Sequence, residues 1–281
     1  MGSPRLVASD VDGTLLGALE QVSERTAAAA RGVVDAGIPF VLVTGRPPRW
    51  LPPVTEALGI RGLTVCSNGA IVYDAHADRV VSASLLDAVT LHDIAHVLRE
   101  ILPGCRFAVE RCMSSARDRV PEQALAEEGF GHGWPDSEIT IAPLGELVGH
   151  DAVKLLVLHE SMNSAQMAEA AGQVLGERVQ ITYSMGLGLL EISAPGVHKA
   201  SGLAEVAREL GVGAEDVLAF GDMPNDLPML EWAGYGVAMG NAHEDLFAVA
   251  DEVTVEHSAD GVARVLERWW TPAGPTAPVA G

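Results

Sequence analysis

The chain of 281 residues has few aromatic side chains, few cysteines and little positive charge. Aromatic residues make up only 5 % of it, so the core must be built mainly from Ala, Val, Leu and Ile. The three cysteines, Cys66, Cys105 and Cys112, form no C-x-x-C pair and have no repeated short spacing, which argues against a disulfide framework. We expect buried or half-buried thiols in a reduced, cytoplasmic protein.

Positive charge is scarce because 18 Lys and Arg stand against 38 Asp and Glu, for a net charge of −20. Such a surface repels phosphate backbones, so we expect no nucleic-acid partner. An anionic substrate would need local positive charge, which makes each Lys or Arg beside a candidate site more interesting. The N-terminus resembles no signal peptide and no apolar run reaches about 18 residues, so we expect no membrane span and no membrane partner.

Hydrophobic residues make up 48 % of the chain and charged residues 20 %, which is typical of a globular protein. Short apolar runs predict buried strands, and segments with helical patterns separate many of them. The predicted strands are Leu6–Ser9, 39–43, 153–158, Leu189–Ser193 and 217–220, and the predicted helices are 23–36, 86–102, 165–175 and 199–210. This alternation indicates an α/β fold with a Rossmann-like, doubly wound parallel sheet.

The middle of the chain is less regular and has a loop-rich stretch around Gly129, Gly131, Gly133 and Pro135. We interpret this part as a second, α+β domain that is inserted into the first. The expected division is a core of residues 1–83 and 191–271, an inserted domain of 84–190 and a flexible tail of 272–281. The sequence does not decide between a monomer and a homodimer.

Polar residues follow three of the predicted strands at the point where each strand ends. Asp10 and Asp12 follow the first strand, Thr44 follows the second, and Asp222 follows the last. In an open parallel sheet ligands bind beyond the carboxyl ends of the strands, so these side chains should meet if the strands are neighbours. Carboxylates that are buried together need compensation, and a divalent cation such as Mg²⁺, which prefers oxygen ligands, would provide it.

Each pattern has an ordinary explanation when it is taken alone. Asp-x-Asp-Gly also suits a solvated turn or a calcium loop. Thr44-Gly45 is common between a strand and a helix, although a hydroxyl there can donate to phosphate and a glycine lets backbone N–H groups approach. Lys199, at the start of a predicted helix, could hold an anion or be a solvated surface side chain. Two acidic loops after two separate buried strands are what favour a site.

Together, the motifs resemble those of the haloacid dehalogenase-like (HAD) phosphatases in order and spacing. Two further segments are similar to parts of the Cof-type subgroup, which has a large cap domain between the second and third motifs. The resemblance covers the whole chain except its tail, and it implies the HAD core fold with an inserted cap. The motifs are Asp10-Val11-Asp12-Gly13-Thr14, Thr44-Gly45-Arg46, Lys199 and Gly221-Asp222-Met223-Pro224-Asn225-Asp226, and the subgroup segments are Ser67-Asn68-Gly69-Ala70 and Asp260-Gly261-Val262.

The resemblance implies a magnesium-dependent phosphatase that hydrolyses a phosphate monoester of a small metabolite, such as a sugar phosphate. Asp10 would be the nucleophile that forms an aspartyl-phosphate. Asp12 would protonate the leaving oxygen and then activate water. The cap would close over the site, expel water and contact the leaving group.

The same resemblance assigns the binding residues. Thr44 and Lys199 would hold the transferring phosphoryl group, and Gly45, Arg46 and Asn68 would contact the substrate. The residues that bind the magnesium ion, directly or through water, would be Asp10, Asp12, Asp222, Asn225 and Asp226.

Other functions stay open from the sequence alone. A sugar phosphomutase would use the same residues but would yield an isomeric sugar phosphate, and a non-catalytic phospho-ligand-binding protein would bind without turnover. A plain nucleotide-binding protein is disfavoured, because no G-x-G-x-x-G or Walker-type run follows the first strand. The candidates for substrate selection in the cap, which the sequence does not rank, are Glu110, Arg111, Trp134, His159 and Tyr183.

Overall fold

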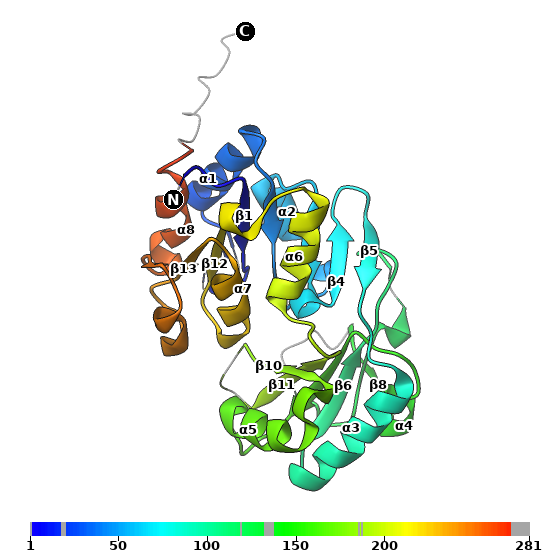
Figure 1. Cartoon of the computed structure of the whole chain (residues 1–281). Coiled ribbons are helices and arrows are strands. Elements are labelled where there is room, and N and C mark those ends of the chain that lie inside the picture. The colour runs from blue at the N-terminus through cyan, green and yellow to red at the C-terminus, as the bar shows by residue number, and fades with distance from the viewer. Residues whose placement is uncertain are drawn as a thin grey trace.

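The computed structural model describes residues 2–17, 21–118, 120–131, 138–184, 186 and 188–270. The expected tail and Trp134 lie outside these residues. In Figure 1 the chain forms one body around a parallel sheet, crosses into a second body below it, and returns to the first. Among the described residues, no helix has both the length and the apolar character needed to cross a membrane.

A five-stranded, fully parallel sheet forms the centre of the first body, in the order β14–β13–β12–β1–β2. Strand β1 lies between β2 and β12, so the strand order reverses direction at β1. This reversal is a topological switch point, where the loops after neighbouring strands open a crevice for ligands. The strands are β1 (Leu6–Ser9), β2 (Phe40–Leu42), β12 (Val217–Gly221), β13 (Tyr235–Ala238) and β14 (Glu252–Val253).

Helices cover both faces of this sheet because its strands are apolar on both sides. Val7 of β1 belongs to an apolar cluster with α1 (Glu24–Asp35), α2 (Pro52–Leu58) and α8 (Gly261–Leu266). Its neighbours Leu6 and Ala8 belong to a second cluster with α6 (Lys199–Glu209) and α7 (Leu227–Trp232). The predicted doubly wound α/β core is therefore confirmed.

Side-chain caps fix where two helices of the core, α1 and α6, begin. Ser23 Oγ accepts a hydrogen bond from Thr26 N at 3.0 Å, so α1 begins where the sequence places it. His198 caps α6 in the same way, because its Nδ1 accepts from Ser201 N at 3.2 Å while Ser201 Oγ accepts from His198 N at 3.0 Å. This reciprocal cap fixes Lys199 as the first helical residue of α6.

The second body, called the cap below, is built on a six-stranded sheet, the cap sheet, in the order β10–β11–β9–β6–β7–β8. Its pairs are antiparallel except β7 with β8. Helices α3 (Ala88–Ile101) and α5 (Ser164–Leu175) pack on one face, and Figure 1 shows them, with α4 (Leu144–Leu147), on the side away from the core. The strands are β6 (Arg106–Glu110), β7 (Ala124–Ala126), β8 (Thr140–Ile141), β9 (Lys154–Leu158), β10 (Gln180–Thr182) and β11 (Leu189–Ser193).

Two of the predicted strands, 153–158 and Leu189–Ser193, belong to this mixed sheet and not to the parallel one. The last residues of β11 still pair with β9 and β10, so the strand crosses the expected boundary at residue 190. The inserted α+β region is present, while its limits as a domain stay a prediction.

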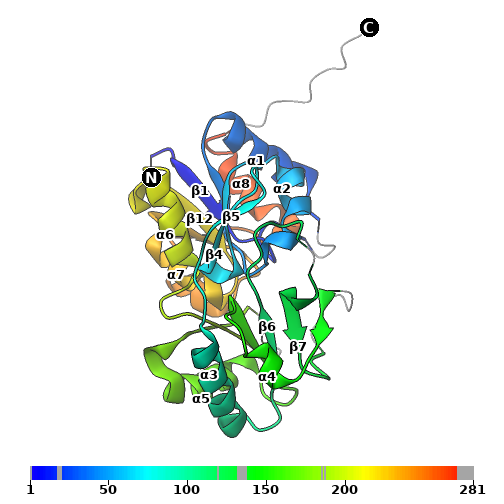
Figure 2. The same ribbon diagram turned by 90° about the vertical axis from the view of Figure 1, so that its right-hand side faces the viewer.

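A third, antiparallel sheet links the two bodies and was not predicted. It consists of β3 (Leu63–Cys66), β4 (Ile71–Asp74) and β5 (Arg79–Ala83), and a parallel bridge between Val43 and Val65 joins it to the end of β2. In Figure 2 the chain after β5 runs into the second body. Short 3-10 turns complete the described chain: η1 (Pro48–Trp50), η2 (Ser67–Gly69), η3 (Pro121–Gln123), η5 (Gly176–Arg178), η6 (Ala214–Asp216), η7 (Pro224–Asp226), η8 (Glu244–Ala248) and η9 (His257–Ala259).

Candidate active site

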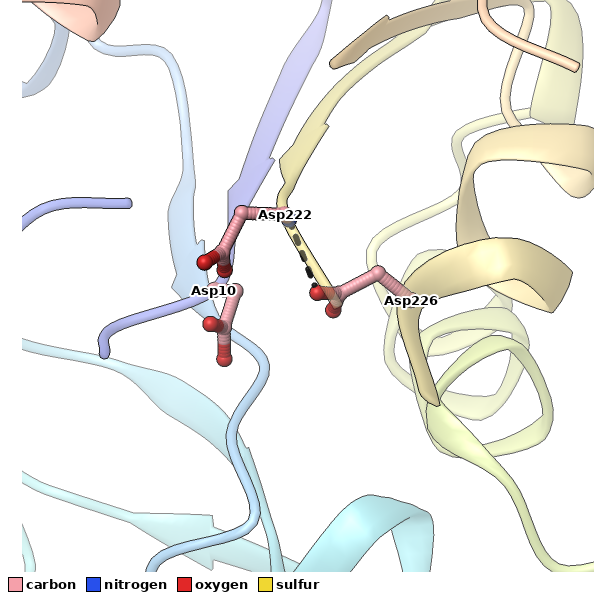
Figure 3. A group of neighbouring side chains, drawn as sticks. All are labelled: Asp10, Asp222 and Asp226. Atoms are coloured by element: carbon pink, nitrogen blue, oxygen red, sulfur yellow. Dashed lines mark hydrogen bonds between the residues drawn. The ribbon is translucent and has the colours of Figure 1, made fainter. Parts of the chain in front are cut away.

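Three buried carboxylates converge at the carboxyl end of the parallel sheet. Asp10 directly follows β1, and Asp222 directly follows β12, which pairs with β1. Asp226 comes from η7, the turn that follows Asp222. One carboxylate oxygen from each lies within 4.8 Å of the other two, and Figure 3 shows the three side chains gathered around one point. The expected meeting of the first and last acidic loops is thus observed.

Lys199 binds two of these carboxylates from the start of α6. Its Nζ donates to Asp10 Oδ1 at 2.7 Å and to Asp226 Oδ1 at 2.5 Å, and the side chain is only 1 % exposed. The other oxygen of Asp226 accepts hydrogen bonds from the backbone N–H groups of Asp222 and Met223, each at 3.0 Å. Asp226 therefore connects the lysine to the loop that positions Asp222.

The charges of the cluster shift the pKa values of its members. Burial raises the pKa of Asp10 well above its ordinary value; the charge of Lys199 opposes this rise, and the neighbouring carboxylates add to it. Burial, with the charge of Asp226, raises the pKa of Asp222 to about 7. Burial alone would lower the pKa of Lys199, but the charges of Asp10 and Asp226 raise it above its ordinary value. One lysine does not offset three buried carboxylates.

Neighbouring polar groups orient the carboxylate of Asp222. Thr14 Oγ1 donates to its Oδ1 at 3.1 Å, and Asn241 Nδ2 lies 3.3 Å from its Oδ2 and donates to the Gly13 carbonyl at 2.9 Å. Gly13 has φ +76, and a Cβ on it would lie 2.2 Å from Asp222 Oδ2. The sequence motif contains Thr14 and Gly13 without assigning them a task, and nothing in the local sequence singled out Asn241.

The donor set fits a small divalent cation. Three carboxylates supply hard oxygen ligands of the kind that Mg²⁺ prefers. The side-chain oxygen of Asn225 is buried in the same loop and has no hydrogen-bond partner among the described residues. Three carboxylates are buried here beside one lysine, so negative charge exceeds positive charge in the cluster, and the raised pKa values of Asp10 and Asp222 agree with this excess. A bound cation would meet both needs.

Asp12 lies apart from this buried group. Its carboxylate is 55 % exposed and is paired with Arg46, whose Nε lies 2.8 Å from Asp12 Oδ2. The two side chains come from the loops after β1 and β2, which are adjacent strands. The arginine, predicted to contact substrate, therefore holds the predicted acid-base residue in this structure.

The loop after β2 and the turn η2 form the other wall of the site. Thr44 is fully buried, its Oγ1 accepts from Arg46 N at 3.1 Å, and its carbonyl accepts from Asn68 N. Asn68 Oδ1 accepts from Asn225 Nδ2 at 3.0 Å, so Asn68 reaches the acidic loop of residues 222–226. Ser67 and Asn68 have positive φ values of 49 and 56, a strained conformation that clusters at functional sites.

The four candidate cap residues that the structure describes contact other groups of the protein. Glu110 pairs with the buried Arg49 of the core, and Arg111 donates to the carbonyl of Glu146. His159 Nε2 lies 3.1 Å from the Pro103 carbonyl, and Tyr183 packs in the cluster that includes α3 and α5. Two cap residues that the sequence did not suggest, Lys154 of β9 and Glu191 of β11, contact the core directly at Gly45 and Asn68.

Comparison with known proteins identifies the class. A family model described as haloacid dehalogenase-like hydrolase matches residues 7–266. The chain therefore belongs to the haloacid dehalogenase-like hydrolases, as its motifs indicated, and it is an enzyme of that class. It is not a plain nucleotide-binding protein.

Similar proteins include curated phosphatases of about the same length. A 5-amino-6-(5-phospho-D-ribitylamino)uracil phosphatase of Bacillus subtilis is 28 % identical over 268 residues, which cover 94 % of this chain and 95 % of the relative. A pyridoxal phosphate phosphatase of Escherichia coli is 28 % identical over 285 residues, which cover 93 % and 97 %.

Solved structures agree along the whole fold. A HAD-superfamily phosphatase from Bacteroides thetaiotaomicron is 25 % identical, with a TM-score of 0.77 over 94 % of each chain. A haloacid dehalogenase-like hydrolase from B. subtilis is 25 % identical, with a TM-score of 0.78 over 94 % of this chain and 99 % of that one.

Proposed function

We propose that this chain is a magnesium-dependent phosphatase that hydrolyses a phosphate monoester of a small metabolite through an aspartyl-phosphate on Asp10. One observation carries the proposal. The carboxylate of Asp10 is buried beside Lys199 and two further carboxylates, at the switch point of a parallel sheet. The positive charge of Lys199, and of a cation bound beside Asp10, would offset the repulsion between this anionic nucleophile and an anionic phosphate.

Asp10 is the nucleophile in this proposal. Lys199 holds Oδ1, which leaves Oδ2 to attack phosphorus while the bond to the leaving oxygen breaks. Asp12 leaves Arg46 and takes up a proton from solvent, gives that proton to the leaving oxygen, and then takes a proton from the water that attacks the phosphorus, which leaves it protonated for the next turnover. The second attack breaks the bond between Asp10 and phosphorus, so phosphate departs and the carboxylate is regenerated.

The remaining residues position and neutralise the phosphoryl group. Thr44 lies at the end of β2 with a hydroxyl that can donate to a phosphate oxygen, and Lys199 supplies positive charge. Asp222, Asn225 and Asp226 are available to hold or brace Mg²⁺, with Asp10 as a further ligand. When bound, the ion offsets the repulsion between the nucleophile and the phosphate.

The cap supports a small substrate. The second sheet contacts the loops of the site through Lys154 and Glu191, so the reacting centre lies against a folded domain. A protein phosphosite would have to fit beneath that sheet, whereas a sugar phosphate or a vitamin phosphate is small enough. The curated relatives that act on pyridoxal phosphate and on a ribityl phosphate suggest compounds to test.

Phosphate release tests the proposal. The full chain is incubated with Mg²⁺ and a panel that includes sugar phosphates, pyridoxal phosphate and 5-amino-6-(5-phospho-D-ribitylamino)uracil. We expect release of free phosphate by the wild type, loss of release in excess chelator, and recovery on addition of Mg²⁺. Activity that persists in excess chelator would remove the ion from the mechanism.

Asp10→Asn is the decisive variant, because asparagine can still accept from Lys199 but is a poor nucleophile. We expect turnover to fall by at least about a thousandfold with an unchanged circular dichroism spectrum. Asp93→Asn, on the exposed surface of α3, is the matched control and should keep full activity. An isomeric sugar phosphate in place of free phosphate would indicate a mutase, and binding without turnover would indicate a non-catalytic protein.

A further inference from the structure

A series of hydrogen-bonded, buried side chains leads from the cap sheet to the acidic loop of residues 222–226. Glu191 of β11 accepts a hydrogen bond at Oε2 from Asn68 Nδ2 at 2.7 Å. Asn68 Oδ1 in turn accepts from Asn225 Nδ2 at 3.0 Å. The three residues are 6 %, 1 % and 4 % exposed, so water does not compete for these bonds.

The carboxylate at the beginning of this series fixes the direction of both amides. A carboxylate only accepts hydrogen bonds, whereas an amide has one accepting and one donating end. Asn68 must therefore turn its NH₂ to Glu191 and its oxygen to Asn225. Asn225 must then use its NH₂ toward Asn68, which leaves its own Oδ1, buried and without a hydrogen-bond partner among the described residues. Oxygen is the end of the amide that can bind a cation.

Lys154 keeps the carboxylate in place. Its Nζ lies 2.6 Å from Glu191 Oε2 and donates to the Gly45 carbonyl at 2.9 Å, and Ser184 Oγ donates to Glu191 Oε1 at 3.3 Å. A buried ion pair commonly gives a fold no more stability than an apolar pair of the same volume. The stability of the cap therefore does not by itself explain why Lys154 and Glu191 form a charged pair here. A need to hold the Glu191 carboxylate in place as an acceptor for Asn68 does explain it.

We infer that Glu191 is a positioning residue for the metal site: through Asn68, it orients the Asn225 amide so that the oxygen is offered to Mg²⁺. The inference rests on the proposed magnesium site. Because Glu191 belongs to the cap sheet and the two asparagines to the core, the orientation depends on the cap lying on the core. The position of the cap and the affinity for Mg²⁺ are therefore coupled through these hydrogen bonds.

Magnesium binding to the full metal-free chain, measured by isothermal titration calorimetry, tests the inference without any turnover. Glu191→Leu removes the acceptor, and Asn68→Gly removes the middle amide while keeping a residue that tolerates positive φ. We expect each to weaken Mg²⁺ binding by about tenfold or more, as loss of a group that orients a metal ligand does. Glu191→Gln can still present an oxygen to Asn68 and should stay within about threefold of the wild type.

Glu110→Leu is the matched control, because Glu110 also forms a buried ion pair between the cap sheet and the core, with Arg49. It should lower the melting temperature and leave Mg²⁺ affinity within about twofold of the wild type. If the three groups act as one chain, the Asn68→Gly/Glu191→Leu double variant binds Mg²⁺ no more weakly than the weaker single variant.

Several results would overturn the inference. These are wild-type affinity in both Glu191→Leu and Asn68→Gly, an equal loss in Glu110→Leu, additive losses in the double variant, or no Mg²⁺ binding by the wild type. If Glu191→Leu does not fold, Asn68→Gly alone decides. A wild type that binds Mg²⁺ but releases no phosphate would reject the phosphatase proposal and leave this test intact.

Discussion

Lys199 Nζ lies 2.7 Å from Asp10 Oδ1, and this contact joins two residues that are 189 positions apart in the chain. The same nitrogen contacts Asp226 Oδ1 at 2.5 Å. The buried ammonium group of Lys199 therefore offsets part of the negative charge of the candidate nucleophile Asp10. It also fixes the loop that supplies Asp222. Lys199 has both a structural and a chemical task, and its replacement should affect both.

Replacement of Lys199 by methionine leaves two buried carboxylates without their partner. We expect the free energy of unfolding to fall by about 3–5 kcal/mol, which is the usual cost of breaking a buried ion pair. The value of kcat/KM should fall by about a hundredfold to a thousandfold, because a preorganised charge at the phosphoryl group is lost. Urea denaturation and phosphate release measure the two effects. A stable variant with near wild-type turnover would contradict both tasks.

Replacement of Asp12 by asparagine should separate the two chemical steps. p-Nitrophenyl phosphate has a leaving group that needs little protonation, so Asp10 can still be phosphorylated. Water is then poorly activated, and the aspartyl-phosphate accumulates. We expect a rapid burst of about one p-nitrophenol per enzyme, followed by slow turnover, in a stopped-flow absorbance experiment. Equal slowing of both phases would argue against Asp12 as the base for water.

Gly13→Ala should damage the site by contact and not only by strain. Gly13 has φ +76 and a Cβ there would lie 2.2 Å from Asp222 Oδ2, whereas Gly37 has φ +77 and an added Cβ would have no neighbour within 4 Å. Both alanine variants should lose about 1–3 kcal/mol of stability from the left-handed backbone conformation. Only Gly13→Ala should also lose Mg²⁺ binding, by calorimetry. Loss in both variants would attribute the effect to strain.

The metal-free protein should lose stability relative to Asp222→Asn as the pH rises from about 4 to about 7. Burial raises the pKa of Asp222 to about 7 in the folded state, above its ordinary value of 3.8, so in this window the folded state binds more protons than the unfolded state. Stability then falls with rising pH, by at most about 1.4 kcal/mol per pH unit for one proton. Lys199 is charged in both states here and adds no slope.

Denaturation in chelator at several pH values, for both proteins, measures this difference. Saturating Mg²⁺ should reduce the slope at the upper end of the window, because the ion stabilises the ionised carboxylates. A stability difference between wild type and Asp222→Asn that does not change with pH would show that Asp222 is not held in the unfavourable environment described above.

Much of the site could be predicted because its residues stand at strand ends in short motifs. Asp10, Thr44 and Asp222 follow apolar runs, and the sheet geometry places such loops together. Glu191 and Lys154 were missed because each is a single charged residue in an apolar strand. Such a side chain is ordinarily expected to point into solvent. Asn241 was missed because no local pattern distinguishes an asparagine that donates to Asp222 from one in a plain turn.

Local patterns also did not specify the sheet to which each strand belongs. The runs 153–158 and Leu189–Ser193 were correctly predicted as strands. The first falls in the expected inserted domain, but most of the second was assigned to the core, and it pairs antiparallel in the cap sheet. Apolar periodicity states that a segment is buried and extended; it does not state which strand lies next to it. Strands such as β3 to β5 have half-exposed or short apolar patterns, and their pairing depends on neighbours.

Local patterns in the sequence were enough to predict the doubly wound core, the beginning of α6 at Lys199 and the positions of the acidic loops. These features follow from local burial, helix caps and turn residues, which act over a few positions. Three relationships are visible only in the folded chain: Asp12 pairs with Arg46, Lys199 lies between Asp10 and Asp226, and Glu191 of the cap reaches Asn68 of the core. Such contacts join residues that are tens to hundreds of positions apart. They form only when the two bodies have folded and packed, because the intervening segments must first bring the residues together.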